Sequence, residues 1–277
     1  MMLRKVLIVS MYIAFTAMAT SVFAAGQDWK SGIPWQKPPV VTPADQPGAP
    51  PSDAVVLFNG KDTAAWEKND AWKIENGELI GGRHDLVTKQ KFGSVQLHVE
   101  FAIQNDIQEN GQGRGNSGIF LGNYEVQVLD NFSPEGATYY DGQCGAIYKQ
   151  CAPLVNVCKK PGDWQTYDII FNRPELKIDK VQVAENGDEK NMKEETVVTV
   201  LRPAYITVIQ NGVLIINHHE IKGTTYYDRP PAYEAHADLM PIHIQDHGNA
   251  PRFRNIWVRE IPDADWHPEP VKPAYYK

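Results

Sequence analysis

The sequence lacks several features, and each absence excludes a class of protein. No cluster of lysine and arginine occurs and the net charge is −7, which disfavours nucleic-acid binding because phosphate neutralisation requires basic stripes. Gly-x-Ser-x-Gly is absent, so the nucleophile motif of α/β-hydrolases has no support. Beyond residue 24 no apolar run approaches the roughly 20 residues of a membrane-spanning helix. Helical periodicity is missing as well, which argues against bundles and coiled coils.

Cysteine is scarce, with three residues in 277, and they recur every seven positions as Cys144, Cys151 and Cys158. No C-x2-C pair exists, so the spacing gives no structural zinc site. In an oxidising compartment two thiols can pair. We expect Cys151 and Cys158 to close a short loop, which leaves Cys144 as a buried thiol.

The first 24 residues have the pattern of a secretory signal. Arg4 and Lys5 precede an apolar run of about 14 residues, and Val22–Ala24 supplies a cleavage site before Ala25. The apolar run is short for a spanning helix, although a retained anchor is the alternative. We therefore expect a periplasmic or secreted chain with no membrane span after cleavage.

Proline, glycine and aromatic residues are abundant: 20 Pro, 21 Gly, 7 Trp, 12 Tyr and 9 Phe. This composition is typical of a β-rich domain with an aromatic-lined site. Residues 25–53 are proline-rich without hydrophobic periodicity, and we predict an extended linker or a strap on the domain. The ordered domain is expected over residues 54–261, and an irregular tail over residues 262–277.

Strand signals fill the predicted domain. Asn76-Gly77 and Asn211-Gly212 each separate two apolar runs and predict β-hairpin turns. Residues 173–200 are charged and turn-rich, which predicts an insertion or an irregular hairpin. Short strands without intervening helical patterns predict an all-β sandwich. The expected strands are 55–58, 72–74, 78–80, 92–103, 118–130, 164–171, 205–209, 213–216, 240–245 and 252–261.

The predicted strand 118–130 separates an apolar face from a polar one. Glu125 and Gln127 share the polar face, about 6–7 Å apart along the strand. Asp130 is five positions after Glu125, an odd number, so a regular strand would point it to the opposite face. A bulge just after Gln127 would bring Asp130 to the polar face. Two carboxylates and an amide on one face can perform acid–base work on a sugar, whereas a solvated outer face is the alternative.

A second polar cluster surrounds Asp246-His247-Gly248. A histidine beside a carboxylate can act as an oriented general base. Neighbours on a strand point in opposite directions, so this requires a turn, which Gly248 favours. The alternative is a hydrogen-bonded turn that orders a loop. Residues 218–220 read His-His-Glu, but no third ligand stands at a defined spacing, and no metal site is predicted.

Six motifs, in a fixed order, are spread over residues 54–261. They are Leu57–Asp62, Arg114–Ile119, Tyr124–Asp130, Gly145–Tyr148, Trp164–Asp168, and Gln245–Gly248 followed by Arg252–Trp257. Together they resemble the 3-keto-disaccharide hydrolase family. The resemblance implies a concanavalin A-like jelly roll of two curved antiparallel sheets, acting on 3-keto-glycosides in the bacterial envelope.

The implied chemistry depends on the keto group, which acidifies the hydrogen on C2 of the sugar. A base removes this proton, the enolate expels the aglycone from C1, and water then adds. Glu125, Asp130 and His247 are the expected catalytic residues. The expected substrate-binding residues are Arg114, Asn116, Gln127, Tyr148, His236, Gln245, Asp246 and Arg254.

Two other functions remain open at this stage. One is a non-catalytic carbohydrate-binding module on the same fold. The other is a retaining laminarinase-like glycosidase, because residues 125–130 are similar to its bulged Glu-x-Asp-x-x-Glu strand, with Gln127 and Asp130 replacing the last two carboxylates. We expect a carbohydrate partner, no nucleic acid and no cofactor. The sequence indicates no protein partner, and no set of residues in it can be recognised as ligands of a structural calcium ion.

Overall fold

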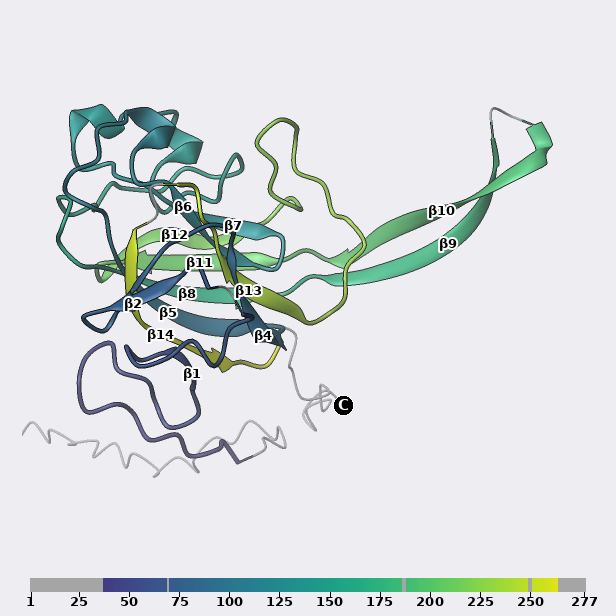
Figure 1. Ribbon diagram of the computed structural model, residues 1–277. Coiled ribbons are helices and arrows are strands. Elements are labelled where there is room, and N and C mark those ends of the chain that lie inside the picture. Colours follow the sequence, from purple (N-terminus) through teal and green to yellow (C-terminus); the bar gives the residue numbers. More distant parts are fainter. Residues whose placement is uncertain (1–36, 69, 186–187, 249–250, 264–277) are drawn as a thin grey trace, which may run out of the picture. The chain divides into compact units, whose positions relative to one another are not determined.

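The computed structural model describes residues 37–263 apart from residues 69, 186–187 and 249–250 (Figure 1). The predicted signal, the first part of the predicted linker and most of the predicted tail lie outside the described residues. The chain divides into two compact units, and the strands of the described residues all belong to the unit Pro38–Trp266. No helix among the described residues is long and apolar enough to cross a membrane.

The larger of two main sheets has eight antiparallel strands. Seven strands follow in the order β12-β11-β8-β5-β14-β3-β2, and β1 pairs with β14. Both Asn-Gly turns predicted from the sequence are confirmed, because their four residues have φ between 52° and 80°. The strands are β1 (Val55–Phe58), β2 (Lys73–Glu75), β3 (Glu78–Ile80), β5 (Val95–Ala102), β8 (Gln165–Asn172), β11 (Tyr205–Gln210), β12 (Val213–Glu220) and β14 (Arg252–Glu260).

The smaller sheet has four strands in the order β4-β13-β6-β7. They are β4 (Leu86–Phe92), β13 (Met240–Ile244), β6 (Ser117–Leu121) and β7 (Tyr124–Val128). Apolar side chains of both sheets form one buried core, in which the Tyr124 ring lies 5.7 Å from that of Phe171 on β8. The predicted all-β sandwich of jelly-roll type is therefore confirmed.

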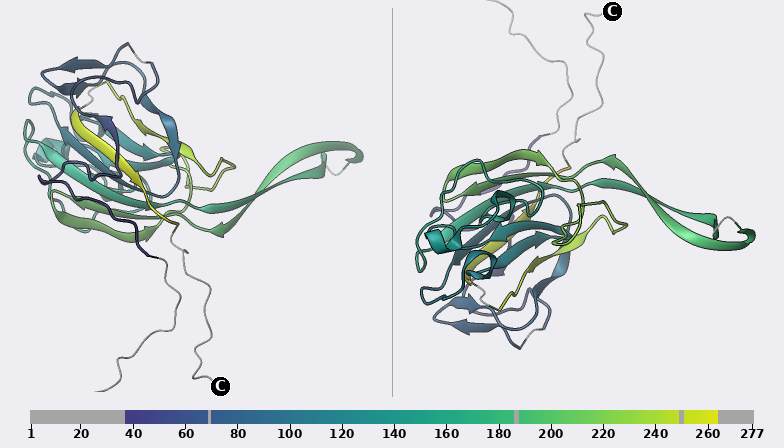
Figure 2. Two further views of the ribbon diagram at one scale, coloured as in Figure 1. Left: turned by 90° about the horizontal axis from the view of Figure 1, so that it is seen from below. Right: turned by 90° about the horizontal axis from the view of Figure 1, so that it is seen from above.

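Two segments differ from their predicted forms. Residues 118–130 form not one strand but the hairpin β6–β7, with Gly122 at φ 62° in the turn. Across this turn the core-facing residues shift from odd numbers (Ile119, Leu121) to even numbers (Tyr124, Val126), a break in the alternation that the expected single strand overlooked. Residues 173–200, predicted as irregular, contribute to a regular hairpin of β9 (Glu175–Glu185) and β10 (Asp188–Arg202). This hairpin extends beyond both sheets in every view (Figures 1 and 2).

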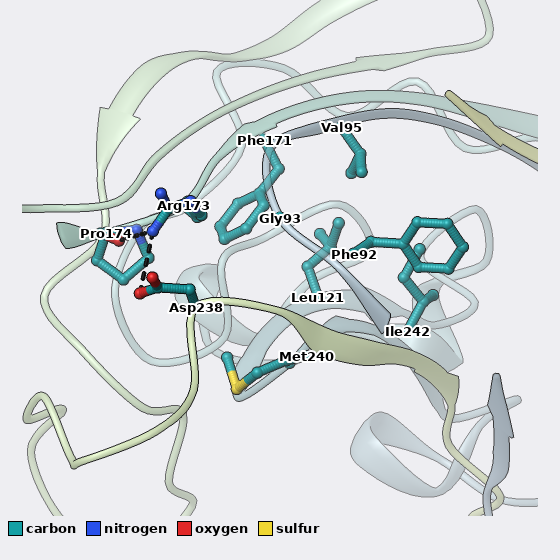
Figure 3. Close-up of a pocket in the computed structure, with 11 residues that line it drawn as sticks. Phe92, Gly93, Val95, Leu121, Phe171, Arg173, Pro174, Asp238, Met240 and Ile242 are labelled. Carbon is teal, nitrogen blue, oxygen red and sulfur yellow. Dashed lines mark hydrogen bonds and ion pairs between the residues drawn. The ribbon is translucent and has the colours of Figure 1, made fainter. Parts of the chain in front are cut away.

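A small apolar hollow lies between the sheets, where Phe171, Leu121 and Met240 converge (Figure 3). Arg173 borders it and forms an ion pair with Asp238 at 3.1 Å. The hollow offers only about 10 Å³, roughly the space of one water molecule. It is a gap in core packing and is too small to hold a sugar.

Candidate active site

A polar cavity opens on the outer face of the four-stranded sheet, opposite the core. It offers about 330 Å³, at the lower end of the range of small-molecule sites. Its lining comes from β6, β7 and four loops, so residues more than 100 positions apart meet there. The lining residues are Asn116, Phe120, Glu125, Gln127, Tyr148, Thr225, Tyr226, Tyr227, Asp228, Arg229, Gln245 and His247.

The pleat of β7 places two functional side chains on the cavity floor. Tyr124, Val126 and Val128 are buried toward the core, so Glu125 and Gln127 point to the outer face. Gly118 on β6 pairs with Gln127. A Cβ at Gly118 would come within 2.7 Å of Glu125 Oε1, so the missing side chain provides the room that the carboxyl occupies.

Glu125 is an acid whose surroundings favour its neutral form. Its side chain lies in the floor, and the residue is only 5% exposed. Burial raises the pKa of Glu125 to about 8, and the charge of nearby Asp85 adds to the shift. The carboxyl therefore carries a proton at neutral pH, as a general acid requires.

Gln127 joins Glu125 to a chain of amides. Gln127 Nε2 donates to Gln112 Oε1 at 3.0 Å, and Gln112 Nε2 donates to the carbonyl oxygen of Gly142 at 2.8 Å. The other end of the Gln127 amide lies 2.9 Å from Glu125 Oε1. If this end is the amide oxygen, it accepts a hydrogen bond from the protonated Glu125 carboxyl. If the amide is rotated, its NH2 group donates a hydrogen bond to the Glu125 carboxylate. Gln127 can thus contact Glu125 in either protonation state.

The walls of the cavity supply further hydrogen-bonding groups. The Tyr148 hydroxyl shares a hydrogen bond of 2.6 Å with that of Tyr139. Burial, followed by this bond, raises the pKa of Tyr148, so the phenol remains a neutral donor. Asn116 is held in place by a 2.7 Å bond from Nδ2 to the Gln112 carbonyl. His247 is exposed to solvent at the rim, and Gln245 stands at the end of β13.

Asp130 and Arg114, both predicted as site residues, do not line the cavity. β6 and β7 pair without a shift as far as Val128, where the ladder ends. Beyond that strand end, Asp130 turns inward and accepts a 2.6 Å bond from Arg114 Nε. Ser133 Oγ donates to the same carboxylate at 2.7 Å. These two residues form a buried ion pair and are not part of the cavity.

Three more predicted residues lie outside the cavity lining. Arg254 belongs to the larger sheet, where its Nε donates to Glu100 Oε2 at 2.6 Å. His236 bonds through Nε2 to the Tyr124 hydroxyl at 2.8 Å. Asp246 accepts the Gly248 backbone N–H at 3.2 Å, so it orders the turn beside His247, as the alternative interpretation of that cluster expected.

The loop between β12 and β13 contributes a wall that sequence reasoning missed. Thr225, Tyr226, Tyr227, Asp228 and Arg229 all line the cavity. The Arg229 guanidinium lies 4.0 Å from the centre of the Tyr226 ring, whereas Tyr227 is 81% exposed. The signal available in the sequence was the run of two tyrosines, an acid and a base before Pro230-Pro231. Lying outside any strand, the run has no periodicity that would assign it to a face.

Within the described part of the chain, no three His, Cys, Asp or Glu side chains converge in a way that would hold a metal ion. The histidines 218 and 219, considered in the sequence, lie on β12. That strand does not line the cavity.

The pKa of Glu125 predicts an unusual pH dependence of stability. Between pH ~4.5 and ~8 the folded chain keeps a proton on Glu125 that the unfolded chain releases. The contribution of Glu125 to the free energy of unfolding therefore falls as pH rises through this window, by roughly 5 kcal/mol. Gln at position 125 does not titrate, so the Glu125→Gln variant should lose this slope. Urea unfolding at several pH values tests this, with Glu175→Gln on the exposed arm as a control that should keep the wild-type slope.

The polar cavity on a β-sandwich, with a protonated carboxyl, amides and tyrosines, defines a carbohydrate-active class of protein. Residues 53–259 match the family model described as a 3-keto-alpha-glucoside-1,2-lyase-like domain. The chain therefore belongs to this family, which confirms the resemblance carried by the six sequence motifs. A comparison with curated proteins gives no match.

Solved structures agree with the family assignment. A crystal structure from Parabacteroides distasonis ATCC 8503, described as a candidate glycosyl hydrolase, is 41% identical with a TM-score of 0.70, and the match covers 83% of this chain and 95% of the other. Two further candidate glycosyl hydrolases from that organism are 18% and 20% identical, each with a TM-score of 0.51. Those matches cover 76% and 75% of this chain and 94% and 99% of theirs, and they support the fold alone.

Proposed function

We propose that this protein cleaves 3-keto-glycosides or 3-keto-disaccharides by elimination followed by hydration. The observation that carries the proposal is the buried carboxyl of Glu125 on the floor of a sugar-sized polar cavity, where burial raises its pKa. Among the described residues, Glu125 is the one carboxyl that β7 presents to this cavity. A retaining glycosidase needs a second carboxylate about 5 Å away, and Asp130 is committed to Arg114 instead.

The lining residues can divide the elimination among them. His247, as a neutral imidazole, takes the proton from C2, and the C2–H electrons form the enolate with the C3 oxygen. The hydroxyl of Tyr148 and the amide of Asn116 donate to that oxygen and stabilise its charge. The enolate then collapses, the C1–O bond breaks, and Glu125 gives its proton to the departing oxygen.

Hydration reverses the proton flow at the same groups. Water adds to C1 of the enone while the Glu125 carboxylate takes one of its protons. The imidazolium of His247 returns a proton to C2. The products are the free 3-keto-sugar and the alcohol, and both protein groups regain their starting states.

The β12–β13 loop is the proposed binding surface for the leaving group. The exposed Tyr227 ring can stack against the apolar face of a second sugar or an aromatic aglycone. Arg229 and Asp228 beside it offer charged hydrogen-bond partners. We also propose that the protein works in the periplasm or outside the cell, which rests on the basic-apolar pattern of residues 1–24.

A comparison of substrates tests the proposed function. Purified protein should release aglycone from a 3-keto-glucoside and leave the unoxidised glucoside intact. In D2O the released 3-keto-sugar should carry deuterium at C2, because elimination exchanges that hydrogen with solvent. Cleavage of both substrates without C2 deuterium would indicate direct displacement. Saturable binding without any product would favour the carbohydrate-binding module.

A further inference from the structure

Two of the three cysteines meet behind the cavity floor, and they are not the pair expected from the sequence. The Gln210 Nε2 atom lies 3.5 Å from Cys144 Sγ and 3.7 Å from Cys158 Sγ. Both sulfurs therefore gather around one buried amide. Cys151 Sγ donates instead to the carbonyl of its neighbour Ala152 at 3.4 Å.

Hydrogen bonds fix the backbone at both cysteines. The Cys144 N–H donates to Asn131 Oδ1 at 2.6 Å. The Cys158 N–H donates to Asn156 Oδ1 at 3.0 Å. The next residue, Lys159, donates its N–H to Gln165 Oε1 at 3.0 Å. These contacts fix both chain segments beside the Gln210 amide that both sulfurs approach.

The thiol pair lies directly behind the strand that carries the proposed catalytic acid. Cys144 Sγ is 3.0 Å from the hydroxyl of Tyr167, which donates to the Gln127 carbonyl at 2.7 Å. The Gly145 N–H donates to the same carbonyl at 2.8 Å. A covalent link at Cys144 would therefore stiffen the support of the cavity floor.

The two sulfurs also differ in acidity in a way that suits exchange. The hydrogen bond to Cys144, followed by burial, raises the pKa of the Cys158 thiol. Burial opposes ionisation of Cys144, but hydrogen bonds from Cys158, Tyr167 and Gln210 outweigh it and lower the pKa of Cys144. Cys144 is the buried member of the pair, and the more exposed Cys158 is the sulfur that an external disulfide can reach.

We propose that Cys144 and Cys158 form a disulfide when the folded or folding chain meets a small disulfide oxidant. Cys158 first gives up its proton, and its sulfur displaces one RS⁻ from RSSR to form a mixed disulfide, while the departing RS⁻ takes up a proton as RSH. Cys144 then attacks the Cys158 sulfur and releases the second RSH. One S–S bond of the oxidant is exchanged for one in the protein, and the oxidant takes up both electrons and both protons.

Peptide mapping of the full-length chain tests the proposal. The reduced protein is equilibrated with oxidised glutathione, its remaining thiols are alkylated, and it is digested without reductant. We expect a linked peptide containing Cys144 and Cys158, and an alkylated Cys151. A linked peptide that contains Cys151, or alkylation of all three cysteines, would overturn the assignment.

Thermal unfolding gives a second, independent readout. Reduction of the oxidised protein with dithiothreitol should lower Tm on the order of 5–10 °C, because the disulfide constrains the unfolded chain. The Cys151→Ser variant should keep this shift, and Cys158→Ser should lose it. An equal shift in both variants would contradict the proposal. If Cys158→Ser does not fold, the wild-type peptide map decides.

Discussion

Replacement of Glu125 by glutamine is expected to lower turnover of a 3-keto-glycoside roughly 10²- to 10⁴-fold, the range that general acid–base catalysis contributes. Glutamine fills the same space beside Gly118 and can still hydrogen-bond Gln127, but it cannot protonate the leaving oxygen. KM should change little, because the amide preserves the polar contact. Steady-state kinetics on an aryl 3-keto-glucoside would measure both constants.

Controls separate loss of the acid from loss of the fold. Glu175→Gln removes an exposed carboxylate at the start of the β9 arm and should leave turnover unchanged. Wild-type activity should fall as pH rises through about 8, where Glu125 loses its proton. A substrate with a nitrophenol leaving group needs less protonation, so Glu125→Gln should impair it less than a sugar leaving group. Wild-type turnover in Glu125→Gln would exclude Glu125 as the acid.

Replacement of Asp130 by asparagine is expected to destabilise the fold by about 3–5 kcal/mol, because a charge would remain buried without its partner. The Asp130 side chain is fully buried, and its Arg114 partner is only 13% exposed. Arg114 also donates through Nη1 to the Ile107 carbonyl at 2.7 Å, so the ion pair anchors the preceding loop. A Tm decrease of roughly 6–15 °C should follow.

The same variant distinguishes a structural carboxylate from a catalytic one. At a temperature where Asp130→Asn is folded, its kcat should lie within several-fold of wild type. Asp246→Asn is a matched control, since this acid accepts a local turn bond and is partly exposed, and its effect on Tm should be small. If Asp130→Asn left the stability unchanged and lowered kcat a thousand-fold, Asp130 would be a catalytic residue and not a structural one.

Local patterns predicted most of the strands because their causes are local. Alternation of apolar residues sets which face of β5 or β7 is buried, and the two Asn-Gly pairs adopt positive φ with little strain. The same alternation breaks at the β6–β7 turn, where the core-facing residues shift from odd to even positions, and the expected single strand overlooked this break. It also gave no sign that residues 175–202 would form a long regular arm.

Part of the cavity could be predicted in the same way. The pleat alone puts Glu125 and Gln127 on one face, and both line the cavity. The face on which Asp130 lies could not be predicted in this way, because it depends on whether a bulge or an ion pair forms beyond Val128. That outcome is decided by Arg114, which precedes β6 at the open end of the hairpin and holds Asp130 away from the face that carries Glu125.

The sequence by itself determined an acidic, cysteine-poor, β-rich chain whose motifs mark its family, and it determined the outward face of β7. These are properties of composition and of a two-residue period, which neighbouring residues fix among themselves. Tertiary structure alone decided that the loop at residues 225–229 walls the cavity and that Cys144 meets Cys158. It also raised the pKa of Glu125. Each of these follows from burial and from contacts between distant segments, which no local period encodes.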